Sequence, residues 1–222
     1  MSIEVDTKDC TALSDAELAD MADICTDGSA GFDVGFLSKQ RDEWVLVTQA
    51  RDGGRLVGFS FCTLERIGGT PSLLVGLASV KATSKREQIV RSLMGDQYRR
   101  ALLAFPDEDV LVGTRMADPG AFDAFKGLSD VVPRPEHRPT GEERAWGRRL
   151  AKRFGADGRL DDRTFVLGGT GSPGGVLEYP SLKSGPADVA AFFVPLTEKR
   201  YDCLVAFGWA MAEDLAEGRL GR

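Results

Sequence analysis

The sequence has almost no histidine: His137 is the only one among 222 residues, and it lies between Pro133 and Pro139. A Ser-His-Asp triad or a zinc site with histidine ligands would have to use this residue. Because proline and charged residues surround it, we predict a loop there and interpret His137 as a solvated loop residue. Triad chemistry and histidine-dependent zinc chemistry are therefore not expected.

Cysteine is also scarce, and no CxxC pair occurs among Cys10, Cys25, Cys62 and Cys203. A disulfide framework or a structural zinc site would need closer, patterned spacing. We therefore interpret the four cysteines as small buried hydrophobes, expect no metal, and take a reducing cytoplasm as the simplest location.

Long apolar runs are missing as well. No stretch approaches the ~18 apolar residues of a membrane span. The first ten residues lack the basic start and apolar core of a signal peptide. The formal net charge of −6 tends to repel phosphate backbones. We therefore expect no membrane partner and disfavour a nucleic-acid partner.

The composition that remains is typical of a globular protein, with 42% hydrophobic and 28% charged residues. A chain of this length buries roughly 70% of its unfolded surface, so it holds a core without disulfides or metals. We expect a single domain over residues 1–222.

Three strands joined by tight turns are predicted at residues 44–49, 56–64 and 73–80. Asp52-Gly53-Gly54 and Gly68-Gly69 are the turn signals between them. The third strand, LLVGLASV, is almost entirely apolar, as expected of a central strand buried on both faces. The pattern indicates an antiparallel meander.

A long helix should follow the meander, because an apolar stripe runs from Ile89 to Phe105. Ser84 is its expected N-cap, and Pro106 stops it. A right-handed crossover would make the next strand, residues 109–116, parallel to the preceding one. The order predicts an α+β fold with a mixed sheet and helices on both faces.

Other elements are predicted around this centre. In the first half we expect an edge strand at 2–6 and helices at 14–25, 34–41 and 118–128; Ser14 and Glu17 form a capping box. In the second half we expect a basic amphipathic helix at 141–154, strands at 164–167 and 204–209, a glycine-rich loop at 168–175, a short helix at 187–193 and a helical tail.

The junction between the third strand and the long helix carries a family pattern. Val80 ends the strand, Lys85 follows five residues later, and Leu93-Met94 stand in the helix. In this register the segment resembles the V-x-P-x-x-R-x-x-G-x-G/A pattern and the following apolar pair of the GNAT superfamily of acyl-CoA N-acyltransferases. The resemblance covers about residues 1–135, and residues 136–222 diverge.

This resemblance implies a GNAT-like mixed central sheet, an antiparallel meander plus a parallel strand pair, and a site for acetyl-CoA or another acyl-CoA. In the family, a strand end and a helix N-terminus present free backbone N–H groups to the CoA pyrophosphate. The implied activity is acyl transfer to an amine of a small molecule or a protein, and a homodimer is a common assembly. Carried over to this sequence, the cofactor-binding positions are Val80, Lys85, Arg86, Glu87, Gln88, Ile89 and Val90.

The sequence departs from the family pattern where the chemistry occurs. Both glycine places hold larger residues, Gln88 and Val90. The place of the usual general base, a glutamate, holds Gly76, and the tyrosine that protonates the leaving thiolate is replaced by Phe125. Whether the chain is an enzyme is left open by these departures.

Substitute groups are sought near the split between the strands at 73–80 and 109–116. The candidate catalytic residues are Glu65, Ser79 and Tyr98, and the candidate substrate-binding residues are Arg115 and Asp118. Arg115 would pair with a substrate carboxylate. Plainer interpretations make Glu65 a surface residue at a strand end, Tyr98 a core aromatic, and Arg115 the ion-pair partner of Asp118.

Two other functions stay open. The fold would serve as a binding or assembly module that has lost acyl-CoA chemistry, with the hydrophobic and basic helix around Trp146 as its contact surface. Alternatively, it would carry out another reaction, although no triad, metal cluster or dinucleotide fingerprint indicates one. The glycine-rich loop is interpreted as a linker.

Overall fold

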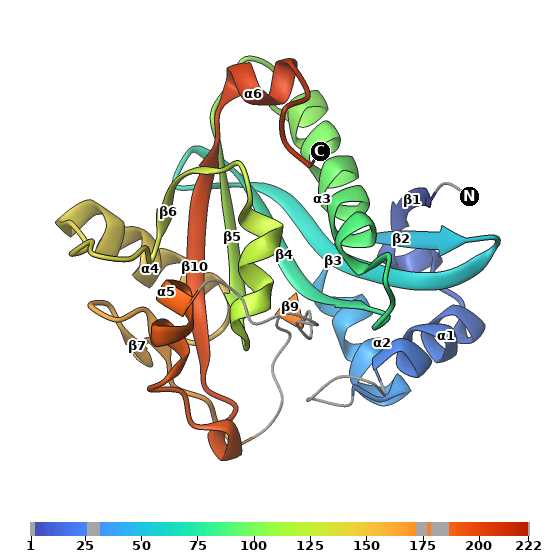
Figure 1. Cartoon of the computed structure of the whole chain (residues 1–222), viewed down its shortest axis with the longest axis horizontal. Coiled ribbons are helices and arrows are strands. Elements are labelled where there is room, and N and C mark those ends of the chain that lie inside the picture. The colour runs from blue at the N-terminus through green and yellow to red at the C-terminus, as the bar shows by residue number, and fades with distance from the viewer. Residues whose placement is uncertain (1–2, 26–31, 172–176, 179–186, 222) are drawn as a thin grey trace.

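The computed structural model describes residues 3–25, 32–171, 177–178 and 187–221. Its centre is one sheet of ten strands in the order β1-β2-β3-β4-β9-β5-β10-β8-β7, with β6 paired to β10 (Figure 1). The strands are β1 (Glu4–Asp9), β2 (Leu46–Asp52), β3 (Arg55–Ile67), β4 (Thr70–Val80), β5 (Val110–Met116), β6 (Ser129–Val132), β7 (Leu160–Asp161), β8 (Val166–Leu167), β9 (Leu177–Glu178) and β10 (Cys203–Ala210).

Helices connect and cover these strands. The α-helices are α1 (Asp15–Cys25), α2 (Val34–Glu43), α3 (Arg86–Ala104), α4 (Gly141–Arg153), α5 (Ala187–Ala190) and α6 (Ala212–Ala216). The 3₁₀ helices are η1 (Cys10–Ala12), η2 (Pro119–Phe125), η3 (Ala191–Phe193) and η4 (Glu198–Arg200).

The first four strands form an antiparallel array, as the turn signals predict. The β2–β3 turn uses Gly53 and Gly54, whose φ angles of 58° and 81° lie in the left-handed region that glycine adopts without strain. After β4, helix α3 crosses over and β5 returns parallel to β4. This arrangement confirms the predicted mixed sheet.

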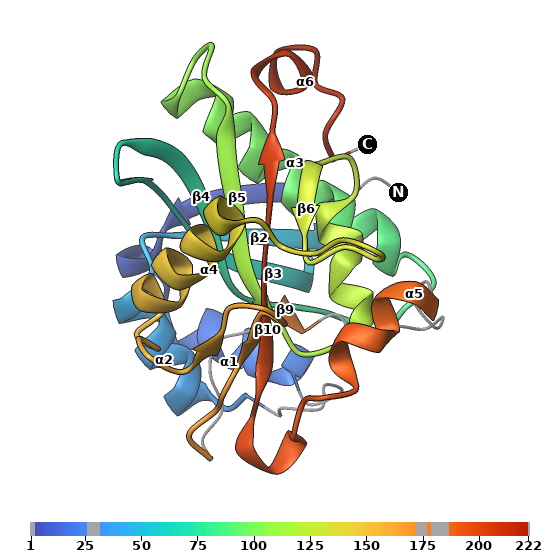
Figure 2. The same ribbon diagram turned by 90° about the vertical axis from the view of Figure 1, so that its left-hand side faces the viewer.

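Helices cover both faces of the sheet (Figures 1 and 2). On one face, Ile89 of α3 lies over Gly58 of β3, where an added Cβ would come within 2.7 Å of the isoleucine side chain. On the opposite face, Leu150 of α4 lies in the same way over Gly113 of β5. Glycine at these two strand positions therefore lets both helices approach the sheet closely.

A polar network fastens the edge strand β1 to α3. The Thr7 hydroxyl donates to a carboxylate oxygen of Asp96 (2.6 Å) and lies 2.8 Å from the Thr48 hydroxyl. Arg99 and Arg100 donate to the same carboxylate, at 2.6 and 2.9 Å. Burial raises the pKa of Asp96, but these hydrogen bonds outweigh it and lower the pKa.

The second half of the chain extends the same sheet. β10 pairs antiparallel with β5, from Leu204 opposite Met116 to Ala210 opposite Val110. Its other edge pairs with β8 and β6. The predicted strand at 204–209 is confirmed, whereas the strand expected at 164–167 is reduced to β8 because Phe165 has a φ of 60°.

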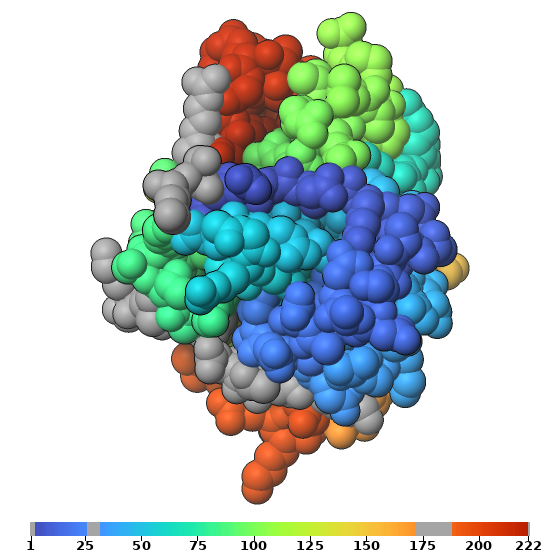
Figure 3. Space-filling view, turned by 90° about the vertical axis from the view of Figure 1, so that its right-hand side faces the viewer, coloured from blue at the N-terminus to red at the C-terminus, as the bar shows by residue number. Residues whose placement is uncertain are grey.

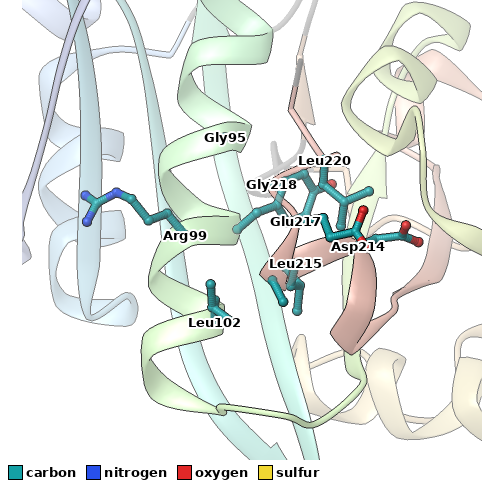
Figure 4. Close-up of a pocket in the computed structure, with 10 residues that line it drawn as sticks. Gly95, Arg99, Leu102, Asp214, Leu215, Glu217, Gly218 and Leu220 are labelled. Atoms are coloured by element: carbon teal, nitrogen blue, oxygen red, sulfur yellow. The ribbon is translucent and has the colours of Figure 1, made fainter.

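The C-terminal segment packs on α3. Gly221 approaches Gly95 so closely that a Cβ at 221 would lie 2.5 Å from the Gly95 Cα. A cavity of about 360 Å³ lies between this segment and α3 (Figure 4). The carboxylates at its edge, Asp214 and Glu217, both pair with Arg219.

Two expectations about local structure are wrong. α3 has Lys85 as its N-cap, without a side-chain cap, so Ser84 does not begin the helix. The helix expected at 118–128 is the 3₁₀ helix η2, in which the Asp118 carboxylate accepts from the Gly120 amide at 2.7 Å. The strand β6 that follows it was not predicted.

His137 is not the solvated residue we expected. It is half-buried, and its Nε2 lies 2.9 and 2.8 Å from the two carboxylate oxygens of Glu143. Glu143 also accepts from the Thr140 amide in a capping box and pairs with Arg134 at 3.2 Å. These contacts fasten the loop before α4 to the first turn of the helix.

The contact surface expected around Trp146 is also wrong. Trp146 is buried on the sheet and meets Trp209 of β10 edge to face, with 6.1 Å between the ring centroids. Leu150 is fully buried beside it. The apolar stripe of α4 is therefore part of the core. All four cysteines are buried, as predicted.

The N-terminal elements form the side of the molecule seen in Figure 3, where β1 and α1 appear in blue. Glu17 of α1 accepts from Lys8 of β1 at 2.5 Å and completes the predicted capping box with Ser14. Burial raises the pKa of Glu17, but the bonds from Lys8 and Ser14 outweigh it and lower the pKa to about 2.

We therefore predict that Glu17→Gln lowers the unfolding free energy at pH 7 by about 1 kcal/mol, the usual contribution of a helix cap. A carboxylate with a lowered folded pKa stabilises above its unfolded pKa and loses that effect as pH falls toward the folded pKa. The difference from wild type should shrink between about pH 4.5 and pH 2 in urea titrations. Glu142→Gln, an exposed first-turn residue of α4, is the control.

Candidate functional site

The site lies where β4 and β5 separate. Their parallel pairing runs from Ser72 opposite Leu111 to Leu74 opposite Gly113 and then stops. At this point the Thr114 hydroxyl donates to the carbonyl of Val75 at 2.8 Å, bridging the two strands. We call the opening beyond it the fork.

A β-bulge in β4 lies at the start of the fork. Ser60 of β3 pairs with Ala78, but Cys62 pairs with Val75, so β4 carries one extra residue between them. A bulge leaves backbone groups out of the ladder. This bulge lies in the ladder of β4 with β3, at the level where β4 stops pairing with β5.

The chain's own strand β9 lies inside the fork. Its two residues pair parallel with Ala78 and Ser79 of β4 and with Met116 of β5. Figure 1 shows β9, in orange, beside the lower end of β5. A strand of two residues after a glycine-rich stretch has too little pattern to be predicted from sequence, and this placement was not expected.

At the end of β4 the chain turns into α3 and leaves its first amides available. The Arg86 amide donates to the Thr83 carbonyl and the Ile89 amide to the Lys85 carbonyl. The N-cap, Lys85, makes no side-chain cap bond. Within the described residues, the amides of Glu87 and Gln88 make no hydrogen bond. Helix N-termini with available amides are places where anions bind in many proteins.

The predicted cofactor-binding residues have different surroundings. Lys85 forms an ion pair with Asp52 of β2, with 2.5 Å between Nζ and the carboxylate. Glu87 and Gln88 are exposed. The remaining four are buried: Val80, Arg86, Ile89 and Val90. Gln88 thus borders the helix end, whereas Val90 packs in the core.

The candidate catalytic residues are not brought together. Glu65 pairs with Ser72, seven residues before Ser79 on β4, which is roughly 20 Å at 3.3 Å per residue. Its carboxylate binds Arg153 of α4 at 2.7 and 3.0 Å. Tyr98 is buried on α3 and donates to the Ala124 carbonyl at 3.1 Å.

Ser79 is the candidate that borders the fork. It is buried, and its backbone faces β9 and also pairs with Phe59 of β3. Ser60, on the same strand as Phe59, is fully buried and accepts from the Gln97 side chain at 2.9 Å. Ser60 therefore contributes to the packing of α3 on the sheet.

The two candidate substrate-binding residues do not meet. The Asp118 carboxylate caps η2, as described above. The Arg115 guanidinium lies over the Phe154 ring, 4.8 Å from its centroid. Among residues 3–25, 32–171, 177–178 and 187–221, no ion pair joins Arg115 to Asp118, so the salt bridge expected from sequence is wrong. Burial lowers the pKa of Arg115. The charges of Cys203 and Glu43 raise this pKa, whereas the charge of Arg159 lowers it further.

No group of three or more potential metal ligands occurs in the part of the chain that the structure describes. Nor does that part contain a helix long and apolar enough to cross a membrane.

Comparison with known proteins finds no family model and no curated protein that matches the sequence. Among solved structures, the chain is similar to the ribosomal-protein-S18-alanine N-acetyltransferase from Escherichia coli, at 12% identity over 63% of this chain and 86% of that one, with a TM-score of 0.43. Ard1 from Thermoplasma volcanium (15% identity, 58% and 86% covered) and the NatC complex bound to Gag peptide and CoA (15%, 62% and 88%) both give 0.42.

These scores are too low to carry an argument about activity, so the fold rests on the strand order itself: a meander, a crossover helix and a parallel strand that diverges. The protein has a GNAT-like fold. Two positions in this fold, Gly76 and Phe125, are those that the sequence resemblance gives to the proton-transfer groups.

Gly76, the place that the sequence resemblance gives to the general base, is covered by a tryptophan. A Cβ at Gly76 would lie 2.3 Å from the indole of Trp44, the residue that follows α2. Trp44 is buried, and its Nε1 donates to the Gln40 side chain at 3.1 Å. A glutamate at 76 would need this ring to move. The role of Trp44 was not predicted, because in the sequence it is only a large aromatic at the start of the strand expected at 44–49.

The GNAT acid position is also apolar. Phe125, at the end of η2, is buried, and the carbonyl of its neighbour Ala124 accepts the Tyr98 hydroxyl. Neither Gly76 nor Phe125 therefore supplies a proton-transfer side chain at the places that the resemblance gives to the base and the acid.

We predict that Gly76→Ala destabilises the fold by about 1–3 kcal/mol, because the added methyl group meets the Trp44 ring. Trp44→Ala should cost about 3–5 kcal/mol on its own. In the double variant the methyl group has space. The double variant should therefore be destabilised by at least ~1 kcal/mol less than the sum of the two single variants. Urea titrations measure all three.

The matched control is Gly141→Ala, since a Cβ at 141 meets nothing within 4 Å. That variant should stay within ~0.5 kcal/mol of wild type. Additive costs for Gly76→Ala and Trp44→Ala would show that the ring does not cover the glycine.

Proposed function

We propose that the protein binds an acyl-CoA and transfers its acyl group to an amine. The observation that supports this is the fork itself: two parallel strands diverge at a β-bulge, next to a helix end whose amides of Glu87 and Gln88 are available. Such a helix end suits a pyrophosphate, and the bulge suits the oxyanion of a reacting carbonyl.

The donor-binding residues in this proposal are those of the β4–α3 turn, from Val80 to Val90. Backbone amides at the start of α3 would take the phosphate oxygens, and Lys85 would add a positive charge after leaving Asp52. An acyl-CoA supplies a thioester. The amine nitrogen forms a bond to its carbonyl carbon, the C–S bond breaks, the thiolate takes up a proton, and the amine's extra proton passes to solvent.

Water would relay these protons, because Gly76 and Phe125 offer no titratable group. Of the candidate catalytic residues, we retain Ser79, whose backbone lies along the fork. Glu65 and Tyr98 have their own partners elsewhere, Arg153 and Ala124.

β9 sets a condition on donor binding. An extended ligand in the fork would compete with β9 for the backbone of Ala78, Ser79 and Met116. The apparent affinity would then be the intrinsic affinity reduced by the fraction of molecules with an open fork. We therefore expect an acyl-CoA to bind this protein more weakly than it would bind a fork without β9.

A second candidate function is a binding module in which acyl-CoA chemistry is lost. Three observations favour it: β9 fills the fork, Trp44 covers the base position, and Phe125 occupies the acid position. Its surface would not be the one expected at Trp146, which is buried.

Thermal unfolding with acetyl-CoA, desulfo-CoA or buffer separates the two. A ligand at about 100 times its Kd should stabilise the fold by roughly 2.7 kcal/mol, a shift of a few degrees at this size. Asp52→Asn should enlarge the shift because it releases Lys85, and Lys85→Ala should reduce it. Lys152→Ala, an exposed lysine of α4, is the control.

If wild type and Asp52→Asn both unfold at the same temperature with and without saturating acetyl-CoA, acyl-CoA binding is ruled out and the binding module is favoured. Equal shifts for Lys85→Ala and Lys152→Ala would place the donor elsewhere on the protein.

A backbone change in β9 tests the competition. Glu178→Pro removes one N–H from the strand and disfavours its pairing. We predict a severalfold lower Kd for acetyl-CoA by isothermal titration calorimetry, because the open fork becomes more populated. An unchanged or higher Kd, with the variant folded by circular dichroism, would show that β9 and the donor do not compete.

A further inference from the structure

A cavity of about 340 Å³ lies between α1 and the turn that joins β2 to β3. Residues from three parts of the chain line it: the C-terminal half of α1, the two strand ends beside the turn, and Lys81, which directly follows β4. The Lys81 amide donates to the Val57 carbonyl at 2.9 Å, so the end of β4 is fixed against β3. The residues that border the fork do not line this cavity, which is therefore a separate place on the protein.

The sheet side of the cavity presents a guanidinium that the protein holds in place. Arg51, at the end of β2, is half-buried; its Nη1 donates to the Gly54 carbonyl at 3.2 Å and its Nη2 to the Gln49 side-chain oxygen at 3.0 Å. Gln49 is itself buried, and the Glu17 carboxylate lies 3.9 Å from Arg51, beyond hydrogen-bond distance. A guanidinium that is already held in one position loses little freedom when it binds an anion.

Two more cations line the same side: Arg55 at the start of β3, and Lys81. Both are exposed. Throughout the part of the chain that the structure describes, neither side chain takes part in a hydrogen bond or in an ion pair within 4.0 Å. Both are therefore available to a ligand in the cavity.

The α1 side of the cavity carries the opposite charge. Asp20 and Asp23, one helical turn apart, line it there. Among residues 3–25, 32–171, 177–178 and 187–221, the Asp20 carboxylate forms no hydrogen bond and no ion pair. The apolar part of the lining comes from Ile24 and Leu56, which are both buried. Asp20 and the cations opposite thus border one cavity without contacting each other directly.

This distribution of charge selects among ligands. A simple anion in the cavity would be attracted by the sheet side and repelled by the α1 side, and a simple cation would meet the reverse. A molecule that carries both charges, a few bonds apart, gains from both sides at once. A volume of about 340 Å³ suits a molecule of small-metabolite size.

We propose that this cavity binds a small zwitterion. Its carboxylate or phosphate group contacts Arg51, Arg55 and Lys81, and its ammonium group contacts Asp20. Because most of these charges are exposed to water, the Kd should be on the order of 1 mM. The proposal does not rest on acyl transfer, since the cavity is separate from the fork.

The test is an NMR titration of the ¹⁵N-labelled full chain. The probes are the twenty amino acids, each compared with its amide, and phosphoethanolamine, compared with ethanolamine and with inorganic phosphate. At least one zwitterion should shift the backbone signals of Asp20, Arg55 and Lys81 in a saturable way. Its Kd should be about threefold to tenfold lower than that of the matched probe with a single charge. Amino acids and phosphoethanolamine distinguish a carboxylate ligand from a phosphate ligand.

Two exposed positions assign the two ends of the ligand. Lys81→Gln should weaken binding of the zwitterion and of inorganic phosphate by about threefold to tenfold. Asp20→Asn should weaken the zwitterion by a similar factor but strengthen inorganic phosphate, because a repulsive charge is removed. A purely structural effect would not change the two probes in opposite directions. Lys152→Gln and Asp157→Asn, at exposed positions that do not line the cavity, are the matched controls.

Three results would overturn the proposal. The first is that no zwitterion shifts these signals. The second is that Lys81→Gln and Asp20→Asn, both folded, bind the zwitterion as tightly as wild type does, which would place the ligand elsewhere. The third is that inorganic phosphate binds as tightly as phosphoethanolamine while Asp20→Asn changes neither, which would show that the α1 side contacts no ligand.

Discussion

The separation of β4 from β5 is the constraint on which the rest of the molecule depends. Parallel pairing holds the strands together only from Ser72 to Leu74, and the bulge that follows bends β4 away. β9 lies in the space that this divergence leaves, and the N-terminus of α3 follows the end of β4 at the same edge of the sheet.

The chemistry of the fork differs from that of the family the sequence resembles. At the base position, Gly76 and Trp44 form a matched pair, since the ring occupies the space a side chain would need. Arg115, near the end of β5, lies over the Phe154 ring instead of pairing with Asp118.

Local signals in the sequence were sufficient for the central elements. Turn glycines and an apolar run predict the meander, and a continuous stripe from Ile89 predicts α3, because these patterns act within a few residues. Features that depend on contacts between distant parts of the chain were not predicted. The burial of Trp146 depends on Trp209, and β9 exists as a strand only because two other strands leave a place for it.

The position of β9 also has a mechanical consequence. With β9 in place, hydrogen bonds run without interruption from β1 to β7 across the whole sheet. Without it, the meander and the half-sheet around β10 would be joined edge to edge only along the short stretch from Ser72 to Leu74. The two residues that fill the fork therefore also extend the backbone connection between the two halves of the sheet beyond Leu74.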